Sequence, residues 1–289
     1  MQQAATPLAL GTRAVLATMH GKERVIAPIL SQELGIQVEV AVGVDTDSFG
    51  TFTRDIERKG SQRETALRKA RAGLAADPLA GIGIASEGSF FAHPHVPFVP
   101  VAREIVLFLD RHGGLELVGQ DESVETNYGH VLASGLNDAL AFANTSGFPA
   151  HGLVVMGSRD GKPDPAILLR KDLDDVAGLA SSVERAIRLC GCAWVETDMR
   201  AHRNPTRMAA IARATRDLVQ RFRSRCPRCD RPGFDTVEHI PGLPCRNCGN
   251  PTRQISAGRM CCDGCGHTLV KLLAKVPFEE PASCDVCNP

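Results

Sequence analysis

Residues 245–266 read CRNCGNPTRQISAGRMCCDGCG, and this stretch decides how the C-terminal part of the chain folds. It holds two CxxC pairs, Cys245/Cys248 and Cys262/Cys265, joined by a short segment in the form of a zinc ribbon. Each CxxC pair forms a tight turn that directs two thiolates at one ion, and two such pairs complete a closed tetrahedral site. The stretch therefore predicts a metal-stabilised hairpin.

Two further CxxC pairs flank this stretch, Cys226/Cys229 before it and Cys284/Cys287 after it. Eight thiolates predict two zinc ions within residues 226–289, and an iron–sulfur cluster is the alternative occupant. A closed site leaves no position for water, so we expect both ions to be structural. Their binding would stabilise a module that is too small to bury much apolar surface.

The sequence leaves open how the four pairs share the two ions. Nesting is the first choice: the second and third pairs form one site, and the first and fourth form the other. Sequential pairing and a cross-braced arrangement, in which the first pair joins the third, are the alternatives. Cys261 lies directly before Cys262 and could replace it as a ligand.

The overall composition is that of an ordinary globular protein of about two domains: 289 residues, 43% hydrophobic and 23% charged. No run of eighteen apolar residues occurs, so we expect neither a membrane span nor a membrane partner. The first eighteen residues lack the features of a secretion signal. Together with thiols grouped in CxxC pairs, this predicts a cytoplasmic protein rather than a disulfide-bonded one.

Charge is distributed unevenly although the net charge is zero. From Arg200 onward the chain holds fifteen of its 33 Lys and Arg residues but eight of its 33 Asp and Glu residues. One interpretation is solvated surface and charge compensation around zinc thiolates. The other is contact between the basic tail and nucleic acid.

Alternating strand and helix patterns predict an α/β body with a mixed sheet. Buried strands are expected near residues 12–18 and 81–86, and helices over 23–34 and 61–74 and around 130–143. The expected domains are a body over 1–205, a linker helix over 206–225 and the zinc-ribbon module over 226–289.

Three segments of the body could converge on a phosphorylated ligand. Residues 17–22, ATMHGK, form a strand-to-helix turn that offers a hydroxyl, backbone amides and a lysine to an anion. A basic helix carries Glu64, and Glu87 directly follows the strand over 81–86, at the usual ligand edge of such a sheet. The two carboxylates could hold Mg²⁺ between a triphosphate and an attacking water. Each segment alone has a plainer interpretation: solvated surface for Thr18 and Lys22, a solvated helix face for Glu64, and the cap of a turn for Glu87.

The order of these segments resembles the inosine/xanthosine triphosphate pyrophosphatase superfamily. That superfamily opens with a T-x-N-x-x-K turn, where this chain has ATMHGK at 17–22, and continues with an E-N-A-x-x-K-A helix, where it has ETALRKA at 64–70. A D-S-G or E-G-G motif corresponds to EGS at 87–89, and an S-H-R motif corresponds to AHR at 201–203. The resemblance spans roughly residues 12–205 and is sparse between 100 and 195. The first motif is one residue shorter, and Ala201 replaces the serine; both differences would fit lost activity or a changed substrate.

The resemblance implies an inosine triphosphatase-like fold and Mg²⁺-dependent cleavage between the α and β phosphates of a nucleoside triphosphate. It assigns phosphate binding to Thr18 and Lys22 and base binding to His202 and Arg203. Glu64 and Glu87 would bind the magnesium ion and activate water, and Lys69 would assist catalysis.

The leading hypothesis is therefore a Mg²⁺-dependent hydrolase of a nucleotide or related phosphorylated small molecule, with a structural two-zinc tail. The alternative is a non-catalytic protein that binds nucleic acid, or acts as an adaptor, through its zinc ribbon. A homodimer is compatible with either hypothesis.

Overall fold

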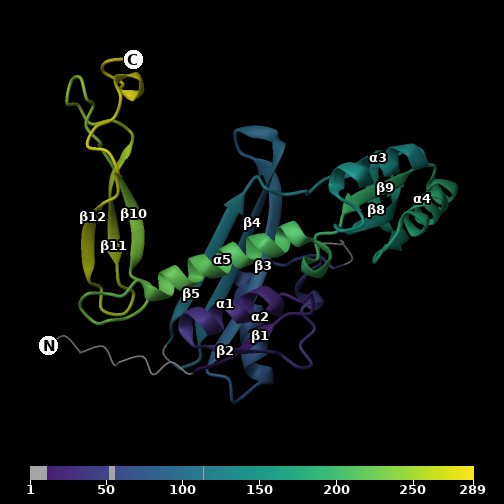
Figure 1. Cartoon of the computed structure of the whole chain (residues 1–289), viewed down its shortest axis with the longest axis horizontal. Helices are drawn as coiled ribbons and strands as arrows, with labels where there is room; N and C mark the ends of the chain where they lie inside the picture. Colours follow the sequence, from purple (N-terminus) through teal and green to yellow (C-terminus); the bar gives the residue numbers. More distant parts are fainter. Residues whose placement is uncertain (1–11, 52–55, 113) are drawn as a thin grey trace. The chain divides into compact units, whose positions relative to one another are not determined.

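A computed structural model of the protein describes residues 12–51, 56–112 and 114–289 (Figure 1). The chain forms two compact units, which we call the body (Leu10–Val219) and the tail (Gln220–Pro289). The division between them falls inside helix α5 (Pro205–Arg223). Among the described residues, no helix is both long enough and apolar enough to cross a membrane.

The first sheet of the body has five strands in the order β2-β1-β3-β4-β5. Strand β1 is parallel to both β2 and β3, whereas β4 is antiparallel to both of its neighbours, β3 and β5. The predicted mixed α/β class is therefore confirmed. The strands are β1 (Arg13–Ala17), β2 (Gln37–Val40), β3 (Ile82–His93), β4 (Val96–Asp110) and β5 (Glu116–Ser123).

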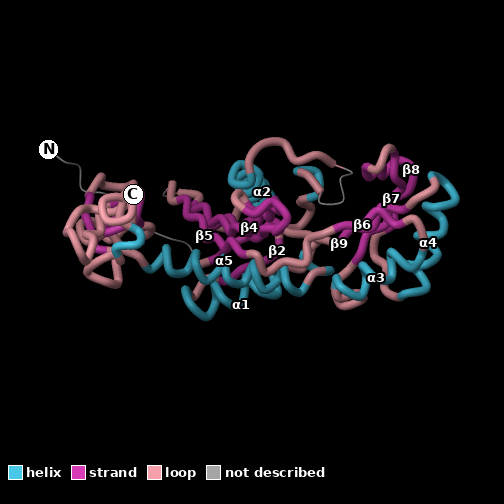
Figure 2. The backbone as a smooth tube through the Cα atoms, turned by 90° about the horizontal axis from the view of Figure 1, so that it is seen from above, coloured by secondary structure: helices cyan, strands magenta, loops and turns pink. Residues whose placement is uncertain are grey.

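Helices cover both faces of this sheet, with α2 (Gln62–Ala76) on one side and α1 (Glu23–Leu34) and α5 on the other (Figure 2). Helix α2 begins with a capping box and packs small residues, Ala66 and Ala70, against Ala85 of β3. A capping box satisfies backbone donors at the first turn that would otherwise lack partners. Small side chains on this face bring α2 close to the sheet.

Helix α5 approaches the sheet even more closely at Gly119 of β5. A Cβ atom at this position would lie 2.3 Å from both the Ala214 carbonyl oxygen and the Leu218 nitrogen. Glycine is therefore needed here, because any side chain would push the helix away from the strand.

The second sheet of the body has four antiparallel strands in the order β6-β9-β7-β8. Helices α3 (Leu136–Ser146) and α4 (Val176–Cys190) pack on one face, and Val154, Met156 and Trp194 cluster on the other. The strands are β6 (His130–Ala133), β7 (Leu153–Arg159), β8 (Lys162–Arg170) and β9 (Ala193–Thr197).

The helix expected around residues 130–143 starts later than predicted. Its first four residues form β6, which pairs with β9, and the helix begins after Gly135. The Asp138 carboxylate accepts hydrogen bonds from the Ser134 hydroxyl, 2.8 Å away, and from the Ser134 and Gly135 nitrogens. This cap fixes the helix start, because it satisfies amides that helix hydrogen bonds cannot reach.

The tail contains a three-stranded antiparallel sheet in the order β10-β11-β12. Its strands are β10 (Asp235–Pro241), β11 (Ile255–Cys261) and β12 (Thr268–Leu272). Three short 3₁₀ segments complete the described elements: η1 (Asp47–Phe49), η2 (Ala201–Arg203) and η3 (Pro281–Ser283).

We expect Gly119→Ala to lower the free energy of unfolding by about 1–3 kcal/mol, because the added methyl group must displace α5. Urea unfolding followed by circular dichroism measures the change. Gly129→Ala is the matched control, since its Cβ would lie at least 3.6 Å from neighbouring atoms. Equal losses in the two variants would contradict the close approach of α5 at Gly119.

Candidate functional site

The cysteines of the tail gather into two groups of four: Cys226, Cys229, Cys262 and Cys265, and Cys245, Cys248, Cys284 and Cys287. In each group the sulfur atoms lie within 4.8 Å of one another, and neighbouring sulfurs are 3.6–3.9 Å apart. A tetrahedron with metal–sulfur bonds of about 2.3 Å has edges of about 3.8 Å. Each group could therefore hold a structural metal ion such as zinc.

The pairing is cross-braced, so the nested arrangement expected from the sequence is wrong. The first CxxC pair joins the third, and the second joins the fourth. The strand order explains this: β10 and β11 are antiparallel, and Asp235 pairs with Cys261. The first pair, just before β10, therefore meets the third, just after β11. The other two pairs meet at the opposite end of the sheet.

The two groups have different surroundings. Phe234 and Met260 pack against the first group, whereas Cys248 of the second group is exposed. Cys261 belongs to neither group, because it pairs within the sheet with Asp235 and Thr268. It is therefore a strand residue rather than a substitute for Cys262.

In the body, polar side chains gather where β3 extends beyond its parallel neighbour. Strand β1 ends at Ala17, opposite Ala85, but β3 continues to His93. Lys22, at the start of α1, contacts β3 just beyond the last residue that pairs with β1. Its Nζ donates a hydrogen bond to the Ser86 carbonyl oxygen at 2.9 Å. Glu87 thus lies within a long strand, not at a strand end as the sequence suggested.

Glu87 is the centre of this polar group. Its Oε2 accepts a hydrogen bond from Lys69 Nζ at 2.7 Å, and both side chains are less than a tenth exposed. Arg58 lies on the other side, with Nη1 3.6 Å from Glu87 Oε1 and 2.9 Å from the Gly88 carbonyl oxygen. The carboxylate is therefore held between two cations from different segments.

The pKa values reflect this crowding of buried charge. Burial, together with the positive charges of Arg207 and Lys69, lowers the pKa of Lys22 to about 7. Burial alone would raise the pKa of Glu87, but Lys69 and Lys22 outweigh it and hold that pKa below its usual value. Burial also lowers the pKa of His20 to about 3. At neutral pH Glu87 is ionised and His20 is neutral.

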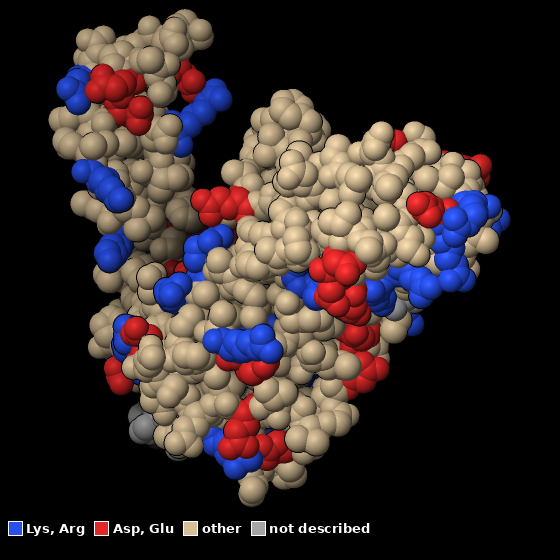
Figure 3. Space-filling view, turned by 45° about the vertical axis from the view of Figure 1, so that its right-hand side comes forward, with Lys and Arg blue, Asp and Glu red and all other residues tan. Residues whose placement is uncertain are grey.

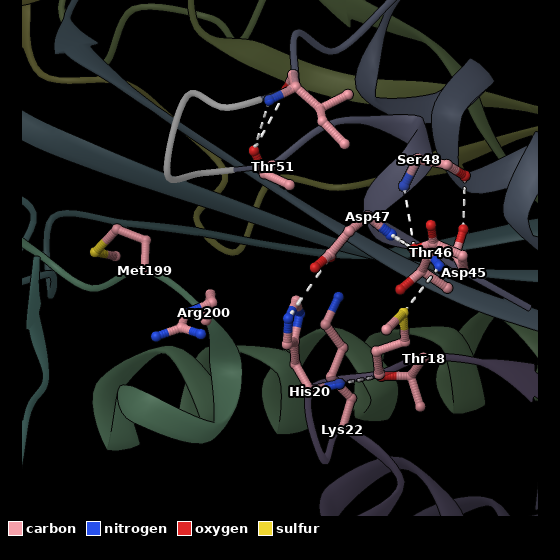
Figure 4. Close-up of polar contacts among 12 residues, drawn as sticks. Thr18, His20, Lys22, Asp45, Thr46, Asp47, Ser48, Thr51, Met199 and Arg200 are labelled. Atoms are coloured by element: carbon pink, nitrogen blue, oxygen red, sulfur yellow. Dashed lines mark hydrogen bonds and ion pairs between the residues drawn. The ribbon is translucent and has the colours of Figure 1, made fainter. Parts of the chain in front are cut away.

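These residues line a small cavity, which we call the anion cavity (Figure 4). Four cations reach it: Lys22, Lys69, Arg200 and Arg207. Figure 4 shows Thr18, His20 and Lys22 grouped near Asp47, whose carboxylate lies 3.6 Å from His20 Nε2. The other side chains lining it belong to Ala17, Thr18, His20, Thr46, Asp47, Thr51 and Glu87.

The structure thus brings together four residues predicted for the site: Thr18, Lys22, Lys69 and Glu87. Glu64 does not line the cavity. Its exposed side chain turns back to the start of α2 and accepts a hydrogen bond from the Ser61 nitrogen at 2.8 Å, closing the capping box. That carboxylate is already used in stabilising the helix terminus.

The predicted base-binding residues also lie outside the cavity lining. His202 is exposed and stacks on His20, with ring centroids 5.1 Å apart. Arg203 donates to Asp174 Oδ1 at 2.8 Å and to the Leu173 carbonyl oxygen at 2.6 Å. Arg203 thus ties the η2 segment to the loop before α4.

Sequence reasoning missed the arginines of the site. Arg207 lies at the start of α5 and pairs with Glu104 of β4 at 2.6 Å, with both side chains essentially fully buried. The Arg200 guanidinium donates hydrogen bonds to both carboxylate oxygens of Asp198 and to Asp172 Oδ1. These partners are separated along the chain or sit in irregular segments, so no local motif marks them. The one usable sequence signal would have been a charged residue on the side of an amphipathic helix that is expected to be buried.

A second, larger cavity of about 230 Å³ adjoins the anion cavity, and Gly50, Thr51 and Glu87 line both. The Phe90 and Tyr128 rings in its wall are stacked, with centroids 5.3 Å apart. We call it the ring cavity. It is also lined by Arg58, Gly88, Ser89, Glu196, Thr197 and Met199.

Metal content tests the cross-braced pairing. We expect the double variant Cys226→Ser/Cys265→Ser to keep one ion, because both residues belong to one group. Cys226→Ser/Cys248→Ser should keep none. Native mass spectrometry counts the bound ions, and Cys261→Ser is the control that should retain two. Sequential pairing would reverse the results of the two double variants.

The buried lysine should make stability depend on pH. Between pH 7 and 10.5 the unfolded chain keeps a proton on Lys22 that the folded chain has lost, so the free energy of unfolding rises with pH in this window. We expect Lys22→Met to remove up to about 1.4 kcal/mol of this rise per pH unit. Urea unfolding at pH 7 and pH 9 measures it, with the exposed Lys162→Met as control. Parallel slopes for wild type and Lys22→Met would refute the lowered pKa.

Comparison with known proteins gives one family match. A family model described as a domain of unknown function, DUF6671, matches residues 73–289. No curated protein and no solved structure matches the chain. The matched range includes Glu87, Glu104, Arg207 and all eight clustered cysteines. Because the match covers well over half of the sequence, the chain belongs to the DUF6671 family.

Proposed function

We propose that the body binds a phosphorylated small molecule of the nucleoside triphosphate class and hydrolyses it with Mg²⁺. One observation carries the proposal: two buried lysines, Lys22 and Lys69, meet around Glu87 in a cavity that two arginines also line. The mixed sheet and the order of its motifs are compatible with a diverged member of the pyrophosphatase superfamily.

The buried Lys22 ammonium group favours an anionic ligand, because its hydrogen bond goes to the Ser86 carbonyl oxygen and not to a carboxylate. Burying a cation costs free energy unless an opposite charge offsets it, and the lowered pKa of Lys22 is a measure of that cost. A phosphate group would bring the missing negative charge and favour the protonated lysine.

The carboxylates of the anion cavity suit Mg²⁺ that arrives with its phosphate. Mg²⁺ is usually held by one or two carboxylates together with substrate phosphates, and Glu87 and Asp47 line the cavity. Outside the cysteine groups, the described residues hold no cluster of three metal-ligating side chains, so a permanently bound ion is not expected. When bound, Mg²⁺ neutralises charge on the phosphate oxygens. Lys69 and Lys22 keep Glu87 ionised, so it can orient a water molecule.

For the tail we propose two structural zinc ions. Four thiolates in a closed tetrahedron suit zinc and leave no position for a substrate. The tail arginines support this role rather than nucleic-acid binding, because several of them pair with acidic residues: Arg246 with Glu280, Arg253 with Asp285 and Arg259 with Glu238. Figure 3 shows basic groups next to acidic groups on the visible face of the tail.

Variants of Glu87 and Glu64 distinguish this proposal from the sequence-based hypothesis. In the proposal only Glu87 acts, whereas the sequence-based hypothesis uses both carboxylates. We expect Glu87→Gln to abolish release of phosphate or pyrophosphate from nucleoside triphosphates in the presence of Mg²⁺. Glu64→Gln should retain the activity, because Glu64 lies outside the cavity and glutamine can also close the capping box. The assay covers ITP, XTP, dITP and the common nucleotides. Complete absence of hydrolysis by the wild-type protein would eliminate the enzyme hypothesis.

A further inference from the structure

The two cysteine groups of the tail differ in how far solvent reaches their sulfur atoms. Each group contains two buried cysteines. The other two cysteines of the first group, Cys229 and Cys265, are half-buried, whereas in the second group Cys287 is half-buried and Cys248 is exposed. Among the eight clustered cysteines, Cys248 is therefore the one that a small molecule in solution reaches most readily.

An apolar shell covers the first group. Phe234 is only 4% exposed and packs with Cys226 and Cys262, and Met260 lies against the same cluster. The His267 ring stacks on the Phe234 ring, with centroids 5.8 Å apart. A shell of this kind limits solvent access to metal-binding thiolates. The first group is therefore shielded from reagents that attack sulfur.

The second group has polar neighbours instead. Asn250 Nδ2 donates a hydrogen bond to Cys248 Sγ at 3.4 Å, and Asn247 Nδ2 donates one to Cys287 Sγ at 3.5 Å. These hydrogen bonds stabilise negative charge on the sulfurs. Both asparagines are themselves exposed, so they keep neither water nor a small oxidant away from Cys248. The second group is thus suited to hold a thiolate that remains accessible.

Resting on the structural metal sites proposed above, we propose that Cys248 is an oxidation site, at which a peroxide links Cys248 to Cys284 and so releases the ion held by the second group. Cys284 Sγ lies 3.6 Å from Cys248 Sγ, closer than the 3.9 Å between the Cys245 and Cys287 sulfurs. A disulfide removes two of the four ligands, and the remaining two cannot close a tetrahedral site. The shielded first group keeps its ion.

The reaction consumes one peroxide and two thiolates. The Cys248 thiolate attacks one peroxide oxygen, the O–O bond breaks, and Cys248 becomes a sulfenic acid while hydroxide leaves. The Cys284 thiolate then attacks the sulfenic sulfur, the S–S bond forms, and the S–O bond breaks to release a second hydroxide. Both hydroxides take protons from solvent and leave as water. The two sulfurs together lose two electrons, and the peroxide gains them.

Zinc release from the full chain tests this proposal. Protein loaded with two equivalents of zinc is treated with hydrogen peroxide beside a chelating dye that reports free zinc. We expect one equivalent to leave roughly tenfold faster than the other, or faster still. Native mass spectrometry should then count one bound ion, and peptide mapping should find a disulfide between Cys248 and Cys284. A thiol reductant with added zinc should restore the second ion, because a disulfide is reversible.

Two variants locate the reaction. Cys248→His keeps a zinc ligand but has no thiol, so this variant should bind two ions and retain both in peroxide. Cys261→Ser removes a cysteine that belongs to neither group, and it should release one ion as the wild-type protein does. Should Cys248→His bind one ion only, the disulfide mapped in the wild-type protein decides the case.

Three results would overturn the oxidation site and leave the structural metal sites standing. Peroxide would release both ions at similar rates, or release neither, or link cysteines of the first group. A wild-type chain that binds no zinc at all would instead remove the proposed structural role of both groups, and peroxide-driven release would fall with it.

Discussion

The body is organised around one buried ion pair, Lys69 with Glu87, at 2.7 Å. Removing two charges from water is costly, and such a pair persists only when its geometry is good and its other hydrogen bonds are satisfied. Gln62 of α2 adds to this fit by donating to the Glu87 carbonyl oxygen at 2.7 Å. The pair therefore fixes α2 on β3, and the anion cavity and the ring cavity are both lined by the same carboxylate.

The tail shows which features of a cysteine-rich module can be predicted from short stretches of sequence. Each CxxC motif indicates two thiolate ligands within four residues, so all eight clustered cysteines could be predicted from the sequence. How the pairs combine depends on strand order and direction, which involve residues tens of positions apart. Cys226 lies beside Cys265 because β10 and β11 are antiparallel, and no local pattern encodes that.

The body shows the same division between local and distant information. Lys22, Lys69 and Glu87 lie on elements whose strand and helix patterns are clear, and the sheet brings them together. Glu64 illustrates a competing local signal: serine followed three residues later by glutamate is also the signature of a capping box, and the helix uses it so. Arg207 and Glu104 are more than a hundred residues apart, and only the packed α5 reveals their contact.

The cross-braced tail has a geometric consequence for its metals. Strands β10 and β11 each contain seven residues and run from one cysteine group toward the other. At about 3.3 Å per residue, they hold the two groups on the order of 20 Å apart. No thiolate can bridge ions across that span, so an ion held by either cysteine group would be an isolated mononuclear centre.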